Sequence, residues 1–240
     1  MTSSKGSRLI SRVLPMAVKF WLQTQLDEIG DLKFEIQASD RQVLSGRVPG
    51  ISLLAQQACY QGVRISHVDV HASDIEINIG QVLRGKSLRL KHTFPIEGQV
   101  VIAGSDLSAS STESILAEGL LDFWQTLLAN PAVAAEVSHH YGSAALQAPY
   151  QSGLEIRETE LVLHLMRQGQ ANISLKSAVQ VEQGHILQLT TACWCLPAGE
   201  QVKSETLSGF CWNLGEQTEV RSLTIENDRL TCECKIMVQP

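Results

Sequence analysis

The sequence predicts an α+β fold with a mostly antiparallel sheet. Two long amphipathic segments stand among roughly ten strand-like segments, and strands and helices do not alternate regularly along the chain. A doubly wound nucleotide-binding fold requires that alternation and is therefore disfavoured. With 240 residues, 44% of them apolar and only 5% aromatic, the chain can bury a core made of Leu, Ile, Val and Ala.

Residues 8–29 form the first predicted helix. Apolar residues recur there at three- and four-residue steps, which is the spacing of one helix face. Pro15 suits a first helical turn, and Gly30 is expected to end the helix. The apolar positions are Leu9, Ile10, Val13, Leu14, Met16, Ala17, Phe20 and Trp21.

Residues 31–103 are predicted to be rich in strands. Apolar and polar residues alternate in several short runs, and turn residues stand at 38–40, 61–62 and 97–98. The alternating apolar positions are Leu32, Phe34, Ile36, Ile51, Leu53, Ala55, Val68, Val70, Ile75, Ile77, Ile79, Leu88 and Leu90.

The alternation changes phase twice in the middle of this region. One change falls between Ile65 and Val68, and the other falls between Val70 and Ile75. A strand cannot otherwise change the face that it buries. Each change therefore predicts a bulge or a turn.

Residues 112–129 form the second predicted helix. Ser110 and Glu113 have the spacing of a capping box, and Asn130-Pro131 is expected to end the helix. Its apolar face is broad, because two adjacent stripes contribute to it. The stripes are Leu116, Leu120, Phe123 and Leu127, and Leu121, Trp124 and Leu128.

The remainder of the chain is a connector followed by further strands. Residues 131–152 are rich in Ala, Ser, His and Gly and predict an irregular or weakly helical connector. Residues 154–240 predict strands again, with hairpin turns at Gln183-Gly184 and Asn227-Asp228. We expect residues 1–240 to form a single domain.

The net charge of −6 is unevenly distributed. The first 26 residues hold four cations and no acid, so the remainder carries 15 Lys and Arg against 25 Asp and Glu. An acidic surface repels phosphate, which excludes nucleic acid as an expected partner. The first helix has two open interpretations, a membrane-contacting helix or a core helix with a solvated basic edge. The membrane-contact candidates are Arg8, Arg12, Lys19, Phe20 and Trp21.

No segment has the pattern of a secretory signal or of a bilayer span. The sequence therefore predicts a cytoplasmic protein with six reduced cysteines.

Residues 80–87 match the formula of a phosphate-binding P-loop, with Lys86 and Ser87 in the last two positions. A P-loop must open a helix, whereas residues 87–95 alternate like a strand and end at Pro95. We therefore expect a turn between strands, and no nucleotide.

The remaining chemical candidates are thiols and imidazoles. Cys193 and Cys195, and Cys232 and Cys234, could hold a metal or undergo redox chemistry, but they continue apolar strand series and are better explained as buried hydrophobes. His67, Asp69 and His71 share the polar side of one strand. The sequence predicts no metal, no cofactor and no catalytic residue, so the protein is not expected to be an enzyme.

Several segments carry a resemblance to a known family. They are residues 10–14, 40–49, 60–66, 75–90, 106–110 and 219–240. With these segments the chain resembles the LmeA-like phospholipid-binding family of bacteria, and its cyanobacterial-type members in particular. The glycine-containing link at 80–87 joins two strands in that family.

The resemblance implies an elongated, strongly curved sheet wrapped around one or two long helices, as in tubular lipid-binding folds. It also implies a non-enzymatic protein that binds phospholipid at the membrane. With the broad face of the second helix, it predicts a groove between sheet and helix. The groove candidates are Leu116, Leu120, Phe123, Trp124 and Leu127. Two alternatives remain, a protein–protein interaction module with a packed core and unknown partner, and a metal or redox protein using the four paired cysteines.

Overall fold

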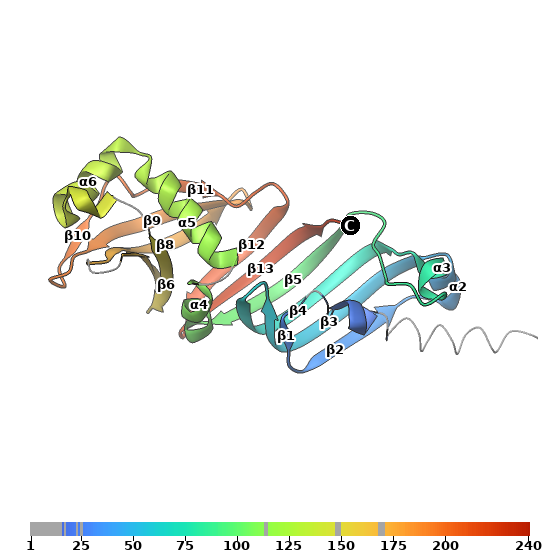
Figure 1. Cartoon of the computed structure of the whole chain (residues 1–240). Helices are drawn as coiled ribbons and strands as arrows, with labels where there is room; N and C mark the ends of the chain where they lie inside the picture. Colours follow the sequence, from blue (N-terminus) through green and yellow to red (C-terminus); the bar gives the residue numbers. More distant parts are fainter. Residues whose placement is uncertain are drawn as a thin grey trace, which may run out of the picture.

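The computed structural model describes residues 16, 18–22, 24, 26–112, 115–146, 150–167 and 171–240. Its described strands form two antiparallel sheets, so the predicted α+β class and mostly antiparallel pairing are confirmed. Figure 1 shows the two sheets at opposite ends of an elongated molecule. The sheets are accompanied by the N-terminal helix, which is described at residues 16, 18–22 and 24, and by α2 (Asp40–Leu44), α3 (Ile79–Val82), α4 (Gly104–Ser110), α5 (Ile115–Leu128), α6 (Pro131–Tyr141) and a 3-10 turn, η1 (Ser143–Leu146).

The first sheet combines the two ends of the sequence. Its strand order is β1-β3-β4-β5-β13-β12, and β2 also pairs with β3. The bounds are β1 (Glu28–Ile29), β2 (Leu32–Gln37), β3 (Arg47–Tyr60), β4 (Val63–Glu76), β5 (Phe94–Ala103), β12 (Thr218–Glu226) and β13 (Arg229–Val238). The C-terminal hairpin therefore completes a sheet that the first hundred residues begin.

The second sheet is formed by the middle of the chain. Its order is β10-β9-β8-β7-β6, and β11 also pairs with β9. The bounds are β6 (Gln151–Arg157), β7 (Glu160–Met166), β8 (Ile173–Glu182), β9 (Ile186–Cys195), β10 (Gln201–Lys203) and β11 (Cys211–Asn213). The amide of Val220 on β12 donates to the carbonyl of Gly184 at 2.6 Å and joins the two sheets.

Each sheet has its own hydrophobic core. Helices α5 and α6 cover the second sheet (Figure 1) and bury Trp124, Leu127 and Val137 against it. The other core lies at the far end of the first sheet. The strands there are covered by Val18 of the N-terminal helix, by α2 and α3, and by residues 88–94. The long helices α5 and α6 therefore lie over the second sheet. Among the described residues, no helix is long and apolar enough to cross a membrane.

Local turn chemistry was predicted well. The turns at 61–62, 183–184 and 227–228 join the hairpins β3–β4, β8–β9 and β12–β13, and all six residues have positive φ. At the two phase changes, β3 and β4 show neither the predicted turn nor a shift of register. The pairing omits Asp74 (φ 54°) of β4 and Gln57 (φ 55°) of β3, and it resumes in the same register.

Several boundaries were predicted wrongly because tertiary contacts override local pattern. The first helix does not extend to 29, since Glu28–Ile29 pairs with β3 as β1. Residues 97–98 form no turn but lie inside β5, between β4 and β13. The expected strand at 88–90 is irregular apart from one bridge between Leu90 and Ile77.

Helices also differ from expectation near the chain's middle. Ser110 is the last residue of α4, and its hydroxyl accepts from the Arg64 amide at 2.9 Å. Glu113, its predicted partner, lies outside the described residues. Asn130 does follow α5, but its side chain accepts from the Ala132 amide at 3.0 Å and so begins α6 within the predicted connector.

Candidate functional site

The first sheet has one apolar and one polar face. Directly opposite residues on adjacent strands share a face, so the register identifies each row. One apolar row runs Phe34, Leu53, Val70, Gly98, Cys234 and Val220, and the next runs Leu32, Ala55, Val68, Val100, Cys232 and Leu223. A row on the opposite face runs Glu35, Ser52, His71, Glu97, Lys235 and Glu219.

At one end, the apolar face is the floor of a groove. The N-terminal helix supplies one wall, and the segment between α3 and β5 supplies another. The groove contains about 620 Å³ of space free of protein atoms, and this volume includes open solvent on one side. About 80 Å³ of it can hold the centre of a water molecule. Every lining residue is apolar: Val18, Trp21, Leu22, Val48, Ile51, Leu53, Val70, Ala72, Ile75, Ile77, Leu88, Leu90, Phe94 and Ile96.

The apolar face continues beyond this groove. Val68, Val100 and Leu223 belong to neither hydrophobic core, although each is apolar and partly exposed. Ile236, on the row beside Ile96, is 44% exposed. A strip of aliphatic side chains therefore extends from the groove across the middle of the sheet toward the α4–α6 end.

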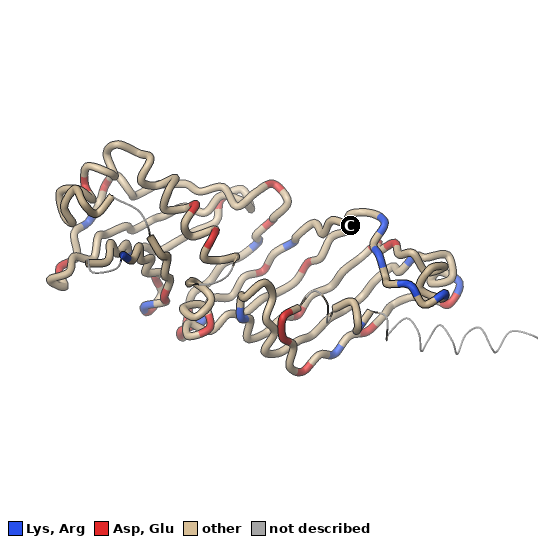
Figure 2. The backbone as a smooth tube through the Cα atoms, in the orientation of Figure 1, with Lys and Arg blue, Asp and Glu red and all other residues tan. Residues whose placement is uncertain are grey.

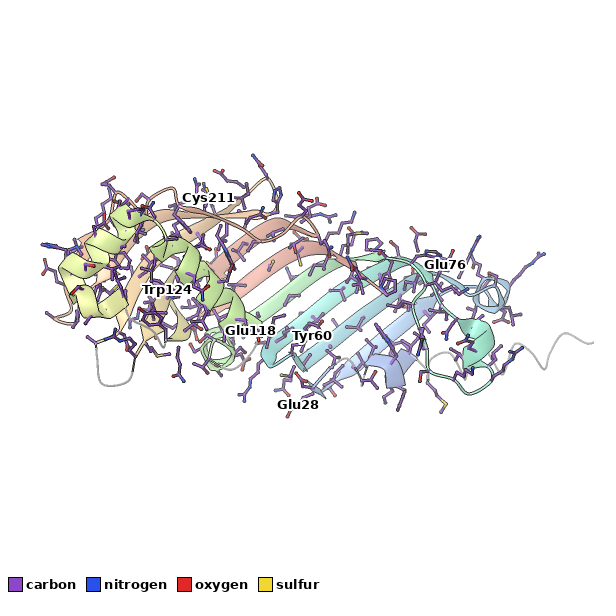
Figure 3. All side chains as sticks on the ribbon, turned by 45° about the horizontal axis from the view of Figure 1, so that its top comes forward. Glu28, Tyr60, Glu76, Glu118, Trp124 and Cys211 are labelled. Carbon is purple, nitrogen blue, oxygen red and sulfur yellow. The ribbon has the colours of Figure 1, made fainter. Side chains whose placement is uncertain are left out.

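The groove candidates on α5 lie elsewhere. Leu120, Phe123, Trp124 and Leu127 are at most 6% exposed and pack into the core of the second sheet, and Leu116 packs against that core. The ring of Phe123 meets those of Phe210 and Trp212 edge-to-face at 5.7 Å. Figure 3 shows Trp124 at the α5 end, with Tyr60 between it and Glu76 at the other end.

The membrane-contact candidates divide between two environments. Phe20 is 64% exposed and Lys19 is exposed, whereas Trp21 lines the groove and Val18 is buried in the core. The described part of the first helix thus packs on the sheet with one face and presents another to solvent, as expected for a core helix with a solvated edge, and contact of its exposed face with a membrane stays a prediction. Arg8 and Arg12 lie outside the described residues.

The segment that matches the P-loop formula has a different geometry. Helix α3 spans Ile79–Val82, at the start of the match, and Ser87 is followed by irregular chain instead of a helix. The Asn78 side chain holds this segment, because it accepts from the Arg89 amide at 2.7 Å and donates to the Ser87 carbonyl at 3.0 Å.

The thiol and imidazole candidates are not brought together. Cys193 and Cys195 are on β9 in the second sheet, whereas Cys232 and Cys234 are on β13 in the first. Within the described ranges, no three His, Cys, Asp or Glu side chains are placed to hold a metal ion. The Nδ1 atom of His71 lies 3.3 Å from the Ser52 hydroxyl, on the polar face of the first sheet.

Sequence reasoning identified the strand residues of the groove but not the groove. Leu53, Val70 and Ile75 stood out through their alternation, yet alternation does not say which helix or loop faces them. The signal that was available is the two apolar residues Leu88 and Leu90, separated by exposed Arg89, in a segment that forms no strand.

Comparison with known proteins places the chain in one family. The model of the family described as LmeA-like phospholipid-binding matches residues 5–235, nearly the whole chain. No curated protein and no solved structure matches the chain. Because the family match covers far more than half of the sequence, the chain belongs to the LmeA-like phospholipid-binding family.

Proposed function

We propose that this protein binds a phospholipid whose acyl chains lie in the groove of the first sheet and along the apolar strip beyond it. The observation that carries the proposal is the groove lining, which is apolar throughout and continues into side chains that neither core uses. About 80 Å³ of the groove can hold the centre of a water molecule, which is less than the roughly 300–1,000 Å³ typical of ligand sites, so the acyl chains must also lie along the apolar strip.

The energetic reason is the hydrophobic effect. Each methylene group of an acyl chain that leaves water gains about 0.8 kcal/mol, and the aliphatic strip is covered in the same step. An acyl chain requires no polar partner from the protein, and the groove lining offers none. The family, which is described by phospholipid binding, supports the same ligand.

The proposed role is binding without catalysis. None of the groove-lining residues has a titratable side chain, so the groove offers no general acid, base or nucleophile to a bound lipid. We further propose that residues 1–240 act as one lipid-binding unit, peripheral on the cytoplasmic side of the inner or thylakoid membrane. Cell fractionation tests the location, and we expect recovery with the membranes at low salt and release from them by a high-salt wash.

Lipid content tests the binding itself. We expect lipid extracted from the purified protein to give phospholipid in mass spectrometry at near-stoichiometric amounts. Val70→Asn places an amide in the groove, where an unpaired polar group against an acyl chain costs about 1–3 kcal/mol. The variant should therefore bind at least about fivefold less lipid than the wild type.

Asp69→Asn is the matched control. Asp69 is the exposed neighbour of Val70 and points to the opposite face of β4, so the same new side chain should leave lipid content unchanged. Equal lipid content in both variants, or no lipid in the wild type, contradicts the proposal. Circular dichroism of each variant checks that the sheet is intact.

A further inference from the structure

A second feature lies on the outer side of the groove wall. Residues 77–96 contain Arg84, Lys86, Arg89 and Lys91 and no Asp or Glu. Outside this segment and the first 26 residues, the chain has 11 Lys and Arg against 25 Asp and Glu. The four cations are therefore a local departure from an acidic protein, and we call residues 83–92 the basic tip.

The cations of the basic tip face solvent. All four are exposed, and among the described residues no carboxylate lies within 4.0 Å of any of their charged nitrogens. The nearby Glu76 is engaged by Arg47 at 3.6 Å and approached by His92 at 3.4 Å. Figure 2 shows the basic residues gathered along the chain between α3 and β5, at the end far from the second sheet.

Exposed apolar side chains accompany these charges. Leu83 is 46% exposed at the start of the basic tip, and Leu44 is 55% exposed at the end of α2, which packs beside α3. Arg41 is exposed on the same short helix, where Asp40 is the acidic neighbour. Cations surrounding exposed leucines are the composition of a surface that meets an anionic lipid interface.

The basic tip is also a wall of the groove. Leu88 and Leu90 turn inward and line it, while Arg89 and Lys91 are exposed on the other side. The backbone is fixed in this arrangement, because the Asn78 amide donates to the Arg89 carbonyl at 3.2 Å and the Lys91 amide donates to the Glu76 carbonyl at 2.9 Å. One segment therefore contacts both the groove and the solvent outside it.

We infer that the basic tip docks on the surface of an anionic phospholipid bilayer and so brings the groove beside the membrane. This inference rests on the proposed lipid-binding function and adds to it the surface and the headgroup charge. The cations attract the anionic headgroups, and Leu44 and Leu83 enter the interface between them. Lys19, which is exposed on the helix beside the groove, adds to the same attraction.

The test is flotation with vesicles of neutral phosphatidylcholine, alone or mixed with anionic phosphatidylglycerol. The full chain should float with the anionic vesicles at low salt, and much less at high salt or with neutral vesicles. Replacing Arg84, Lys86, Arg89 and Lys91 by Ser should weaken partitioning by up to about six-hundredfold, since each of the four cations near an anionic leaflet contributes about fivefold.

The matched control removes four exposed cations from other surfaces, with Lys33, Arg157, Lys203 and Arg229 replaced by Ser. Both variants have the same net charge, so only the position of the charges differs. Strong flotation of the control and weak flotation of the basic-tip variant support the inference. Equal flotation of the two variants overturns it, whether both bind or both fail, because binding then depends on net charge or on another surface.

Lipid content of the same preparations separates this inference from the proposed function. Bound phospholipid that is unchanged in the basic-tip variant, together with lost flotation, supports both. If flotation depends on the basic tip but the purified protein contains no phospholipid, the docking inference is supported and the proposed acyl-chain binding in the groove is contradicted.

Discussion

At the residue scale, two cysteine thiols lie within the apolar strip, where their reactivity can show whether lipid covers it. Cys232 and Cys234 lie on the apolar face of β13, opposite Val100 and Gly98 of β5. A hydrogen bond from the Cys232 thiol lowers the pKa of Cys234 to about 7, although burial acts in the opposite direction. The same hydrogen bond raises the pKa of Cys232, and burial adds to that effect.

Cys234 should therefore show whether lipid covers the strip. In delipidated protein we expect iodoacetamide to modify Cys234 at a rate that increases as the pH rises through about 7, because the thiolate is the nucleophile. Bound phospholipid should slow this reaction at least about tenfold, since it excludes reagent from the strip. Peptide mass spectrometry measures both rates.

Cys211 is the internal control for this reaction. It is exposed on β11 of the second sheet, so its modification should not respond to lipid. If Cys234 reacts equally fast with and without phospholipid, the acyl chains do not reach β13.

A partly buried acceptor, Glu136, stabilises the other end of the molecule. Glu136 of α6 accepts hydrogen bonds from the Trp194 indole at 2.9 Å, from the Ser204 hydroxyl at 2.6 Å, and from Thr206. Burial alone would raise the pKa of Glu136, but the hydrogen bonds from Ser204, Thr206 and Trp194 lower it below its ordinary value. The folded state therefore favours the carboxylate.

Glu136→Gln should destabilise the protein by about 1–3 kcal/mol at pH 7, since the charged acceptor of three donors is lost. A lowered pKa gives stability that is present above the unfolded pKa, about 4.3 for Glu, and that is lost as the pH falls through the folded pKa. The difference between wild type and variant should thus shrink from pH 7 to pH 3 in urea denaturation. A difference that stays constant over this range would show that the carboxylate charge is not involved.

At the element scale, Gly98 allows β5 to lie close to its neighbour β4 in the middle of the apolar face. Its φ is +150°, and a Cβ there would lie 2.2 Å from the Asp69 carbonyl oxygen on β4. Gly98→Ala should destabilise the protein by at least about 1–3 kcal/mol, because the backbone conformation is strained for Ala and β4 must move. Thermal or urea denaturation measures the loss.

Gly80→Ala is the control for the same change. Gly80 lies in α3, and a Cβ there would meet no atom within 4 Å. Because Ala favours a helix interior over Gly by about 0.5–1 kcal/mol, this variant should be as stable as wild type or slightly more so. Equal losses at the two positions would mean that neither contact nor backbone angle at Gly98 matters.

Gly98 also shows why sequence predicted some elements and not others. Gln183-Gly184 and Asn227-Asp228 are turns because their own backbone preferences require it, and local sequence carries that information. Glu97-Gly98 has similar composition, but strands β4 and β13 on both sides keep it extended. Residues 131–152 were predicted as irregular or weakly helical and did not stand out as a regular helix for the same reason, since Val133 and Val137 of α6 gain their burial from the second sheet.

The apolar strip was beyond prediction for a further reason. Each of its strands alternates recognisably, but Cys232 meets Val100 only through the pairing of segments far apart in the sequence. Alternation gives each strand an apolar side without saying how much of it the protein's own helices cover. The broad face of α5 was the visible candidate, whereas the structure uses that face in the core of the second sheet.

At the scale of the whole molecule, charge and apolar surface are arranged along one long axis. The basic tip, the groove and the exposed side of the N-terminal helix lie at one end, and the core built by α5 and α6 lies at the other (Figure 1). Membrane contact and lipid binding would therefore involve the first sheet, while the second sheet keeps its stability from its own helices.

This division predicts where bound lipid protects the backbone from hydrogen exchange. Ligand that binds only the folded state stabilises it in proportion to occupancy, and regions that touch the ligand gain the most protection from local opening. In lipid-loaded protein, compared with delipidated protein, exchange should slow in β3, β4 and β5 and in the described helical residues 16–24. Exchange in α5, β8 and β9 should change little, because Leu127, Leu175 and Trp194 are already fully buried in a packed core. Slower exchange confined to α5 and the second sheet would instead place the acyl chains beside Leu116, Leu120 and Trp124, and would contradict the groove on the first sheet.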